Sequence, residues 1–383
     1  MVTANPARAG LVILALCVFA GVTTEMLPVG LLPAVGRAVG TGDSATGLLV
    51  SLYAALVAVL AVPLTLATRR VPRKRLLLIA TGCFAASNAL AAVAPGYALL
   101  AVARGLGGAT HAVFFAVCIG YAARLVPPER TGSALAFASA GISAGFVLGV
   151  PLATALGNAV GWRGAFAALG VLMLVLLLLV AGRLPEVEPA ARDEAAGTGV
   201  RRLVAVIGSN ILVYTGQYAL YSYVSVLLLR AGAAAELVGP ILLVFGGCGL
   251  LGVWLAGRRL DVRFRGTALV VLVVLCAGIG STGAGFPVLA LVIAGGAVWN
   301  CAFGPVASIH QTAAIRARAT TEDLAGAWIV ATANVGIAAG AGVGGVVLDH
   351  FGLRAVAWVA AAAVAGAAAI VLAARDAFPR TTV

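Results

Sequence analysis

Charged side chains are scarce in this sequence. Only 10% of its 383 residues are Asp, Glu, Lys or Arg, whereas a soluble domain carries about a quarter. Hydrophobic residues make up 62% of the chain, and the mean hydropathy is +1.10. Because a water-soluble core of this size needs much less apolar surface, the composition excludes a soluble protein and predicts one that lies in a lipid bilayer.

Acidic residues are the scarcest of the charged types, with 13 against 25 basic residues and a formal net charge of +12. The basic residues stand in short clusters between long apolar runs, which is typical of loops that set membrane topology. We therefore expect no nucleic-acid partner. The six cysteines lack the paired spacing of a disulfide framework or a metal site, so no metal is expected either.

Apolar runs long enough to cross a bilayer recur along the whole chain. A helix of about 20 apolar residues crosses the hydrocarbon core, which is ~30 Å thick. Twelve such runs are present, at residues 10–33, 45–67, 75–94, 97–121, 132–157, 163–182, 203–229, 238–256, 266–284, 286–308, 323–347 and 353–374. The sequence thus predicts an all-α membrane protein with twelve transmembrane helices.

The basic residues also predict the topology. With the N-terminus inside, 20 of the 25 basic residues fall on the cytoplasmic side, four on the opposite side and one inside a span. Since positive charge marks the cytoplasmic side, we expect both termini in the cytoplasm and a multi-pass protein of a bacterial inner membrane. The densest cytoplasmic cluster joins the second and third runs and consists of Arg69, Arg70, Arg73, Lys74 and Arg75.

An internal repeat divides the chain into halves. Gly161-Trp162-Arg163 has an echo 191 positions later in Gly352-Leu353-Arg354, and the same offset relates Gly145 to Gly336. Between the halves lies a polar, proline-containing segment. We therefore expect two pseudo-symmetric six-helix bundles, 1–182 and 203–383, joined by a cytoplasmic linker over 183–202, with a substrate site at their interface.

Ionisable residues inside the spans are the strongest functional signal, because a charge at membrane depth costs several kcal/mol. Glu25 is the one acidic residue that we place inside a span. An apolar site favours the neutral carboxyl, so Glu25 is a candidate for binding and releasing a proton or for binding substrate. A protonated structural carboxyl is the alternative.

Arg104 and His111 are the corresponding basic candidates, in the run 97–121. A guanidinium cannot shed its charge, so Arg104 needs a carboxylate, backbone carbonyls or substrate as its partner. His111 follows by seven residues, which places it two turns along on nearly the same face. Histidine titrates near physiological pH, so both residues are candidates for proton coupling and for the cavity. Purely structural pairing of Arg104 and a neutral core histidine are the alternatives.

Neutral polar residues form a stripe in the run 203–229. Asn210, Tyr214, Gln217 and Tyr221 share one helical face and turn towards protein or water rather than lipid. Hydrogen bonding between helices without substrate contact is the alternative. Further candidates for the cavity wall are Trp299, Asn300 and Asn334.

Small residues recur every four positions at Gly141, Gly145 and Gly149, followed by Pro151. Such a face permits close helix contact.

These features resemble the major facilitator superfamily, in its drug:proton antiporter branch, over essentially the whole chain. The segment Arg104 to Phe115 is similar to a motif of the bacterial sugar-efflux members, and Thr24-Glu25-Met26 resembles their first-helix signature. Gly149-Val150-Pro151 followed by Gly161-Trp162-Arg163 resembles their antiporter motif, and Tyr221-Ser222-Tyr223 a further one. Chloramphenicol-efflux transporters are similar as well.

The resemblance implies proton-driven export of a small molecule of sugar or drug type, with no cofactor and the proton gradient as energy source. One departure is clear: the basic loop at 69–75 lacks the aspartate of the family pattern, which leaves Asp261 of the second half as the candidate for a charge latch. Proton-coupled uptake and a receptor without flux remain open from the residues. No paired carboxylates, activated nucleophile or phosphate-binding loop is found, so we expect no enzyme. The expected partners are substrate, protons and lipid, around a monomer.

Overall fold

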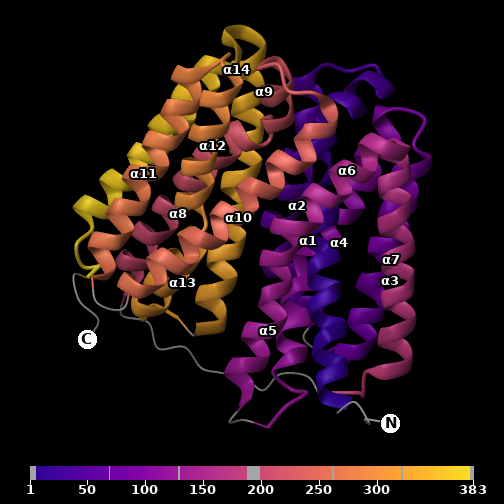
Figure 1. Cartoon of the computed structure of the whole chain (residues 1–383). Coiled ribbons are helices and arrows are strands. Elements are labelled where there is room, and N and C mark those ends of the chain that lie inside the picture. Colours follow the sequence, from indigo (N-terminus) through magenta and orange to yellow (C-terminus); the bar gives the residue numbers. More distant parts are fainter. Residues whose placement is uncertain are drawn as a thin grey trace.

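The computed structural model describes residues 6–68, 70–127, 130–187, 199–260, 263–320 and 322–379, and these form an all-α protein without strands. Figure 1 shows helices packed along a common direction. In chain order the helices are α1 (Pro6–Val39), α2 (Asp43–Thr68), α3 (Arg73–Val93), α4 (Tyr97–Ala122), α5 (Thr131–Ala144), the π-helix η2 (Gly145–Gly149), α6 (Val150–Val160), α7 (Trp162–Arg183), α8 (Val200–Tyr221), α9 (Val224–Arg230), α10 (Ala235–Leu260), α11 (Phe264–Gly285), α12 (Leu289–Phe303), α13 (Val306–Arg316) and α14 (Glu322–Ala373).

Eleven helical stretches in the described residues are long and apolar enough to cross a membrane. Several of them combine elements that the sequence treats as one run: α5, η2 and α6 are continuous, as are α12 and α13 apart from a turn at Gly304 and Pro305. A π-helical turn precedes Pro151, whose missing N–H cannot continue the regular ladder. The predicted all-α architecture is therefore confirmed, whereas the number of twelve transmembrane helices stays a prediction.

The last stretch, α14, consists of two antiparallel segments joined at Gly352, whose φ of 76° is not helical. Its first segment runs parallel to α8, because Gly336 lies against Ile211 and Gly344 against Ala219. Its second segment runs the opposite way. Ala360 lies against Gly216, and the carbonyl of Ala367 accepts from Ser209. Figure 1 shows this reversal at the upper end of the molecule.

The predicted repeat is visible in two matched corners. Gly161 and Gly352 both have positive φ, 86° and 76°. Two residues after each glycine, an arginine donates to the carbonyl that caps a neighbouring helix: Arg163 to Ala94 after α3, at 2.7 Å, and Arg354 to Phe286 after α11, at 2.6 Å. Only glycine adopts this backbone without strain, so the two corners are equivalent building blocks.

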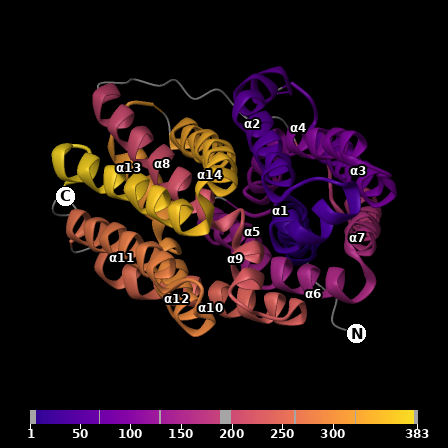
Figure 2. The same ribbon diagram turned by 90° about the horizontal axis from the view of Figure 1, so that it is seen from above.

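The helices form two groups. Figure 2 shows α1, α2, α3, α4 and α7 on one side of the view and α8, α11, α12 and α13 on the other. The domain limits 1–182 and 203–383 stay a prediction, because residues 188–198 of the linker lie outside the described part of the chain.

Contacts between the two groups gather at the end where the matched corners lie. Arg230 forms a 2.9 Å ion pair with Asp43, and Asn158 donates to the carbonyl of Ala235 at 2.7 Å. Ser225 of α9 donates to the carbonyl of Val29 at 2.7 Å. Proline at position 33 cannot donate to that carbonyl within α1, which leaves it available to the other half.

Candidate functional site

A buried polar cluster lies where α1, α2 and α4 meet, and Arg104 anchors it. Arg104 is 2% exposed, and its guanidinium donates from Nη1 to the carbonyl of Thr24 and from Nη2 to that of Glu25, both at 2.8 Å. The Thr24 carbonyl lacks its usual helical donor because residue 28 is proline, inside α1. Of the partners that the sequence left open for Arg104, the structure thus selects backbone carbonyls.

Tyr53 of α2 also packs against this arginine. The guanidinium carbon lies 4.2 Å from the centre of the Tyr53 ring, a cation–π geometry. Gly108 makes the approach possible, because a Cβ there would lie 2.5 Å from the carbonyl oxygen of Tyr53. The Gly107-Gly108 pair of α4 therefore places Arg104 and Tyr53 against each other.

His111 lies between Glu25 and Tyr53. Its Nδ1 is 3.5 Å from Glu25 Oε2 and 3.2 Å from the Tyr53 hydroxyl. Glu25 and His111 are 6% and 7% exposed. This distance is longer than a short hydrogen bond, and the contact is an ion pair only when His111 carries a proton.

The charge of the cluster depends on that proton. Arg104 contributes a fixed positive charge. With Glu25 ionised and His111 neutral, the cluster is neutral overall, and one added proton makes it singly positive. In a low-dielectric interior these two forms differ strongly in energy. The arrangement can therefore couple protonation to a change of structure.

A cavity of about 220 Å³ lies beside the cluster, between the two groups of helices. It takes its wall from α5 and η2 on one side and from α8, α10 and α12 on the other. Aromatic and amide side chains predominate, and among the described residues no Asp, Glu, Lys or Arg lines the cavity. These side chains are Phe146, Tyr214, Gln217, Tyr218, Tyr221, Phe245, Asn300 and Phe303. Such a wall suits an uncharged molecule with a ring.

The predicted stripe on α8 meets this cavity only in part. Tyr214, Gln217 and Tyr221 line it. Asn210 instead donates to the Ile329 carbonyl at 2.9 Å and to Thr332 Oγ1 at 3.0 Å, so it ties α8 to α14.

Of the three other residues predicted for the cavity wall, one lines the cavity and two do not. Asn300 lines the cavity. Trp299 lies behind the wall and donates from Nε1 to Gln217 Oε1 at 2.5 Å. Asn334 donates to the carbonyl of Val330, four residues earlier in α14, at 3.0 Å.

Tyr218 links the cluster to the cavity. It lines the cavity, and its hydroxyl lies 3.7 Å from the sulfur of Met26, the residue after Glu25. Its ring stacks on Tyr214 with centroids 6.2 Å apart. The cavity is therefore separated from Met26, the neighbour of Glu25, by one side chain.

Sequence reasoning missed Tyr53, as well as Phe146, Phe245 and Phe303. Tyr53 could have been found, because it is one of seven tyrosines and stands alone among apolar residues. The phenylalanines carry no such signal, since an apolar ring in a span is as expected on the lipid face as on a cavity wall.

The predicted packing residues lie against α1. A Cβ at Gly141 would meet the Ala15 carbonyl at 2.3 Å, and one at Gly145 would meet Val22 at 2.7 Å. Gly149 lies against Thr23, and Pro151 follows the π-helical turn. The glycine face thus joins α5 and η2 closely to the helix that carries Glu25.

In the basic loop, Arg70 and Arg75 are exposed, and Arg73 begins α3. Arg69 and Asp261 lie outside the described residues, so the proposed latch of Asp261 stays a prediction.

The sequence matches the family model of the Major Facilitator Superfamily over residues 14–321. The chain belongs to this superfamily. Relatives of this facilitator include a "Probable sugar efflux transporter" of Mannheimia succiniciproducens, 30% identical over 94% of this chain and 91% of the relative. A "Chloramphenicol efflux pump" of Mycobacterium tuberculosis is 32% identical over 88% of this chain and 85% of the pump.

Solved structures agree with the fold of this facilitator. A bacterial homologue of the human lysosomal transporter Spinster, in an inward-facing and unoccupied conformation, superposes with a TM-score of 0.78 at 16% identity and covers 99% of both chains. The human organic anion transporter MFSD10 gives 0.72 at 17% identity, over 96% of this chain and 100% of its own. The facilitator is thus a multi-pass membrane transporter with efflux-type relatives, and this is not the profile of an enzyme.

Proposed function

We propose that this transporter exports a small uncharged molecule, of sugar or amphenicol type, in exchange for protons. It works by alternating access of its two halves, crosses a bacterial inner membrane twelve times and keeps both termini in the cytoplasm. The observation that carries the proposal is the buried contact of Glu25 with His111, next to the aromatic cavity between the halves.

Proton coupling follows from the charge of the cluster. Arg104 holds the backbone of residues 24 and 25, so the Glu25 carboxyl has a fixed position opposite His111. Loading a proton changes the buried charge from neutral to positive, and the two forms favour different surroundings. We propose that the neutral cluster favours the state closed at the end of the Asp43–Arg230 pair, and that the protonated cluster favours its opening.

An uncharged substrate follows from the cavity wall. Tyrosine and amide side chains can hydrogen-bond hydroxyl groups, while aromatic faces pack against a ring. A charged substrate would lie in this wall without a counter-charge, which is costly in a low-dielectric site. The names of the efflux relatives support the same two substrate types.

Alternating access is supported by the contacts that close one end. Val29, freed by proline at position 33, accepts from Ser225, and Arg230 pairs with Asp43. Both are single polar contacts that water can replace, so this end can open without leaving a costly unpaired group. Between them and the cavity lies the Tyr218–Met26 contact.

The test is transport by the purified protein in proteoliposomes. Sugars, amphenicols and cationic dyes are first screened for stabilisation, because a ligand of the folded state raises the apparent unfolding temperature. For each ligand found, we then measure flux with and without an imposed pH gradient. The proposal predicts an uncharged ligand that accumulates on the acidic side.

Three results would contradict it. Accumulation on the alkaline side indicates proton-coupled uptake. Flux that ignores the pH gradient removes the coupling. Stabilisation by cationic dyes alone removes the assignment of an uncharged substrate.

A further inference from the structure

A second and larger hollow lies on the outside of the helix bundle, away from the transport cavity. It encloses about 910 Å³ between α10, α11 and α12. Its floor is α12, against which α10 packs closely at Gly252, where a Cβ would overlap the carbonyl of Cys301. Leu255, Val270 and Val274 on its rim are 48%, 60% and 38% exposed, so this groove opens to the surface that faces lipid.

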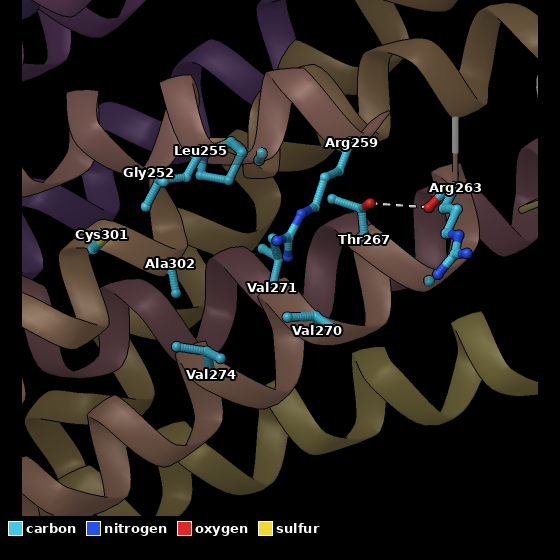
Figure 3. A pocket seen from close by; sticks show the side chains of 13 residues that line it. Gly252, Leu255, Arg259, Arg263, Thr267, Val270, Val271, Val274, Cys301 and Ala302 are labelled. Carbon is cyan, nitrogen blue, oxygen red and sulfur yellow. Dashed lines mark hydrogen bonds between the residues drawn. The ribbon is translucent and has the colours of Figure 1, made fainter. Parts of the chain in front are cut away.

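The groove is apolar along its length and basic at one end. Figure 3 shows Arg259 reaching into it beside Val271, and Arg263 beyond Thr267, whose hydroxyl donates to the Arg263 carbonyl. Both arginines line the groove and are exposed. Among the residues that the structure describes, neither guanidinium is within salt-bridge distance of a carboxylate.

This basic end lies beside the last turn of α14 and Phe378. Arg265 donates to the carbonyls of Val371 and Leu372 at the end of α14, at 3.3 and 2.5 Å, and the Phe264 ring stacks on Phe378. In the topology on which the proposed function rests, this is the cytoplasmic side. Residues 258–265 hold four arginines and one aspartate, so the sequence adds net positive charge there.

We propose that the groove binds one anionic phospholipid of the cytoplasmic leaflet. An acyl chain lies along the apolar floor, and the phosphodiester lies at Arg259 and Arg263. The occupant comes from the bilayer because the groove opens towards it. It is anionic because two exposed guanidinium groups, with no carboxylate partner among the described residues, stand at the depth of the headgroups. An acyl chain gains little by leaving other lipid, so the headgroup charge decides the affinity.

The bound lipid can also affect transport, through helix α10. The same helix separates the two hollows: Gly249, Leu250 and Val253 of α10 line the transport cavity, whereas Leu255 and Ala256 line the groove. A lipid chain in the groove therefore supports the wall against which substrate binds.

The test is lipid binding to the purified full-length protein in detergent, measured by native mass spectrometry. Phosphatidylglycerol and phosphatidylcholine with identical acyl chains are titrated in parallel. With two arginines near the membrane surface, phosphatidylglycerol should bind about 30-fold more tightly. In the variant Arg259→Gln/Arg263→Gln this preference should fall to within about threefold.

Two further variants separate charge from shape. Arg201→Gln/Arg202→Gln removes the same charge from two exposed arginines at the start of α8 and should keep the preference. Gly266→Phe introduces a ring at a position that lines the groove and where a Cβ would meet nothing within 4 Å, and it should weaken binding of phosphatidylglycerol at least tenfold.

Equal binding of both lipids by the unchanged protein would overturn the proposal, and that comparison needs no variant to fold. An undiminished preference in the Arg259/Arg263 variant, or unchanged binding in Gly266→Phe, would overturn it as well. None of these results depends on substrate, so failure here leaves the proposed transport function standing.

Discussion

The two halves of this transporter share their corners but not their interiors. Arg163 and Arg354 follow positive-φ glycines and cap equivalent helices. At the repeat offset of 191, however, Glu25 corresponds to Gly216, Arg104 to Gly295 and His111 to Ala302. The repeat therefore preserves the devices that build the fold, whereas the cluster of Glu25, Arg104 and His111 has no counterpart at the matching positions of the second half.

This difference assigns separate tasks to the halves. The first half holds a charged cluster anchored on the backbone of α1, and the second half supplies most of the neutral wall of the cavity. Buried charge is costly and is retained where it does something. Changes in the first half should therefore affect energy coupling, and changes in the second half should affect substrate affinity.

The largest effect is expected from Arg104→Ala. The buried carbonyl of Thr24 loses its donor, at a cost of about 1–3 kcal/mol, and the carbonyl of Glu25 loses its bond to Arg104. We expect transport in proteoliposomes to fall at least about 100-fold, while the protein still elutes as a folded species. Arg104→Lys should recover only part of the activity, since a point charge does not reproduce the planar fork. Full activity of Arg104→Ala would remove the cluster from the mechanism.

A smaller effect of a different kind is expected from Gln217→Ala in the second half. Trp299 Nε1–H loses its acceptor inside the protein, which lowers stability by about 1–3 kcal/mol. Substrate affinity should fall about tenfold, whereas the ratio of flux with and without a pH gradient stays unchanged. Gln311→Ala, at an exposed site on α13, is the matched control. Loss of the gradient dependence in Gln217→Ala would contradict the assignment of energy coupling to the first half alone.

The smallest effects are expected at the shared corners. Arg163→Ala and Arg354→Ala each remove hydrogen bonding to one capping carbonyl, worth about 1 kcal/mol. Arg163→Ala should cost slightly more, because its guanidinium also lies 4.3 Å from the Trp162 ring. Thermal unfolding should show two small, similar shifts with transport within about twofold of the unchanged protein. A severe transport defect in only one of them would show that the corners are not equivalent.

The architecture was predictable from the sequence because lipid imposes a simple length rule on apolar runs. Glu25, Arg104 and His111 stood out for a related reason, since charge is rare in spans. The spacing of seven residues also placed Arg104 and His111 on nearly the same helical face. The partner of Arg104 was not predictable from the sequence. It is a backbone carbonyl of α1, which lacks a helical donor because residue 28 is proline, and α1 is far from Arg104 along the chain.

The cavity was predictable only where polarity marked it. Tyr214, Gln217 and Tyr221 follow a helical stripe that lipid would not tolerate, and all three line the wall. Asn210 follows the same stripe but bonds to α14. Periodicity gives the face of a helix, and it does not say whether that face meets a cavity or a neighbouring helix. The phenylalanines of the wall remained hidden because an apolar ring fits both lipid and cavity.

The central claim is that Glu25 carries the coupled proton. Glu25→Gln keeps the shape of the side chain and fixes it in a neutral form, while Glu236→Gln makes the same change at an exposed site on α10. The decisive measurement is substrate flux in proteoliposomes with and without a pH gradient. We predict that Glu25→Gln binds and exchanges substrate at equal pH but no longer accumulates it when a gradient is imposed, whereas Glu236→Gln behaves like the unchanged protein. Accumulation against the substrate gradient by Glu25→Gln would show that the proton binds elsewhere.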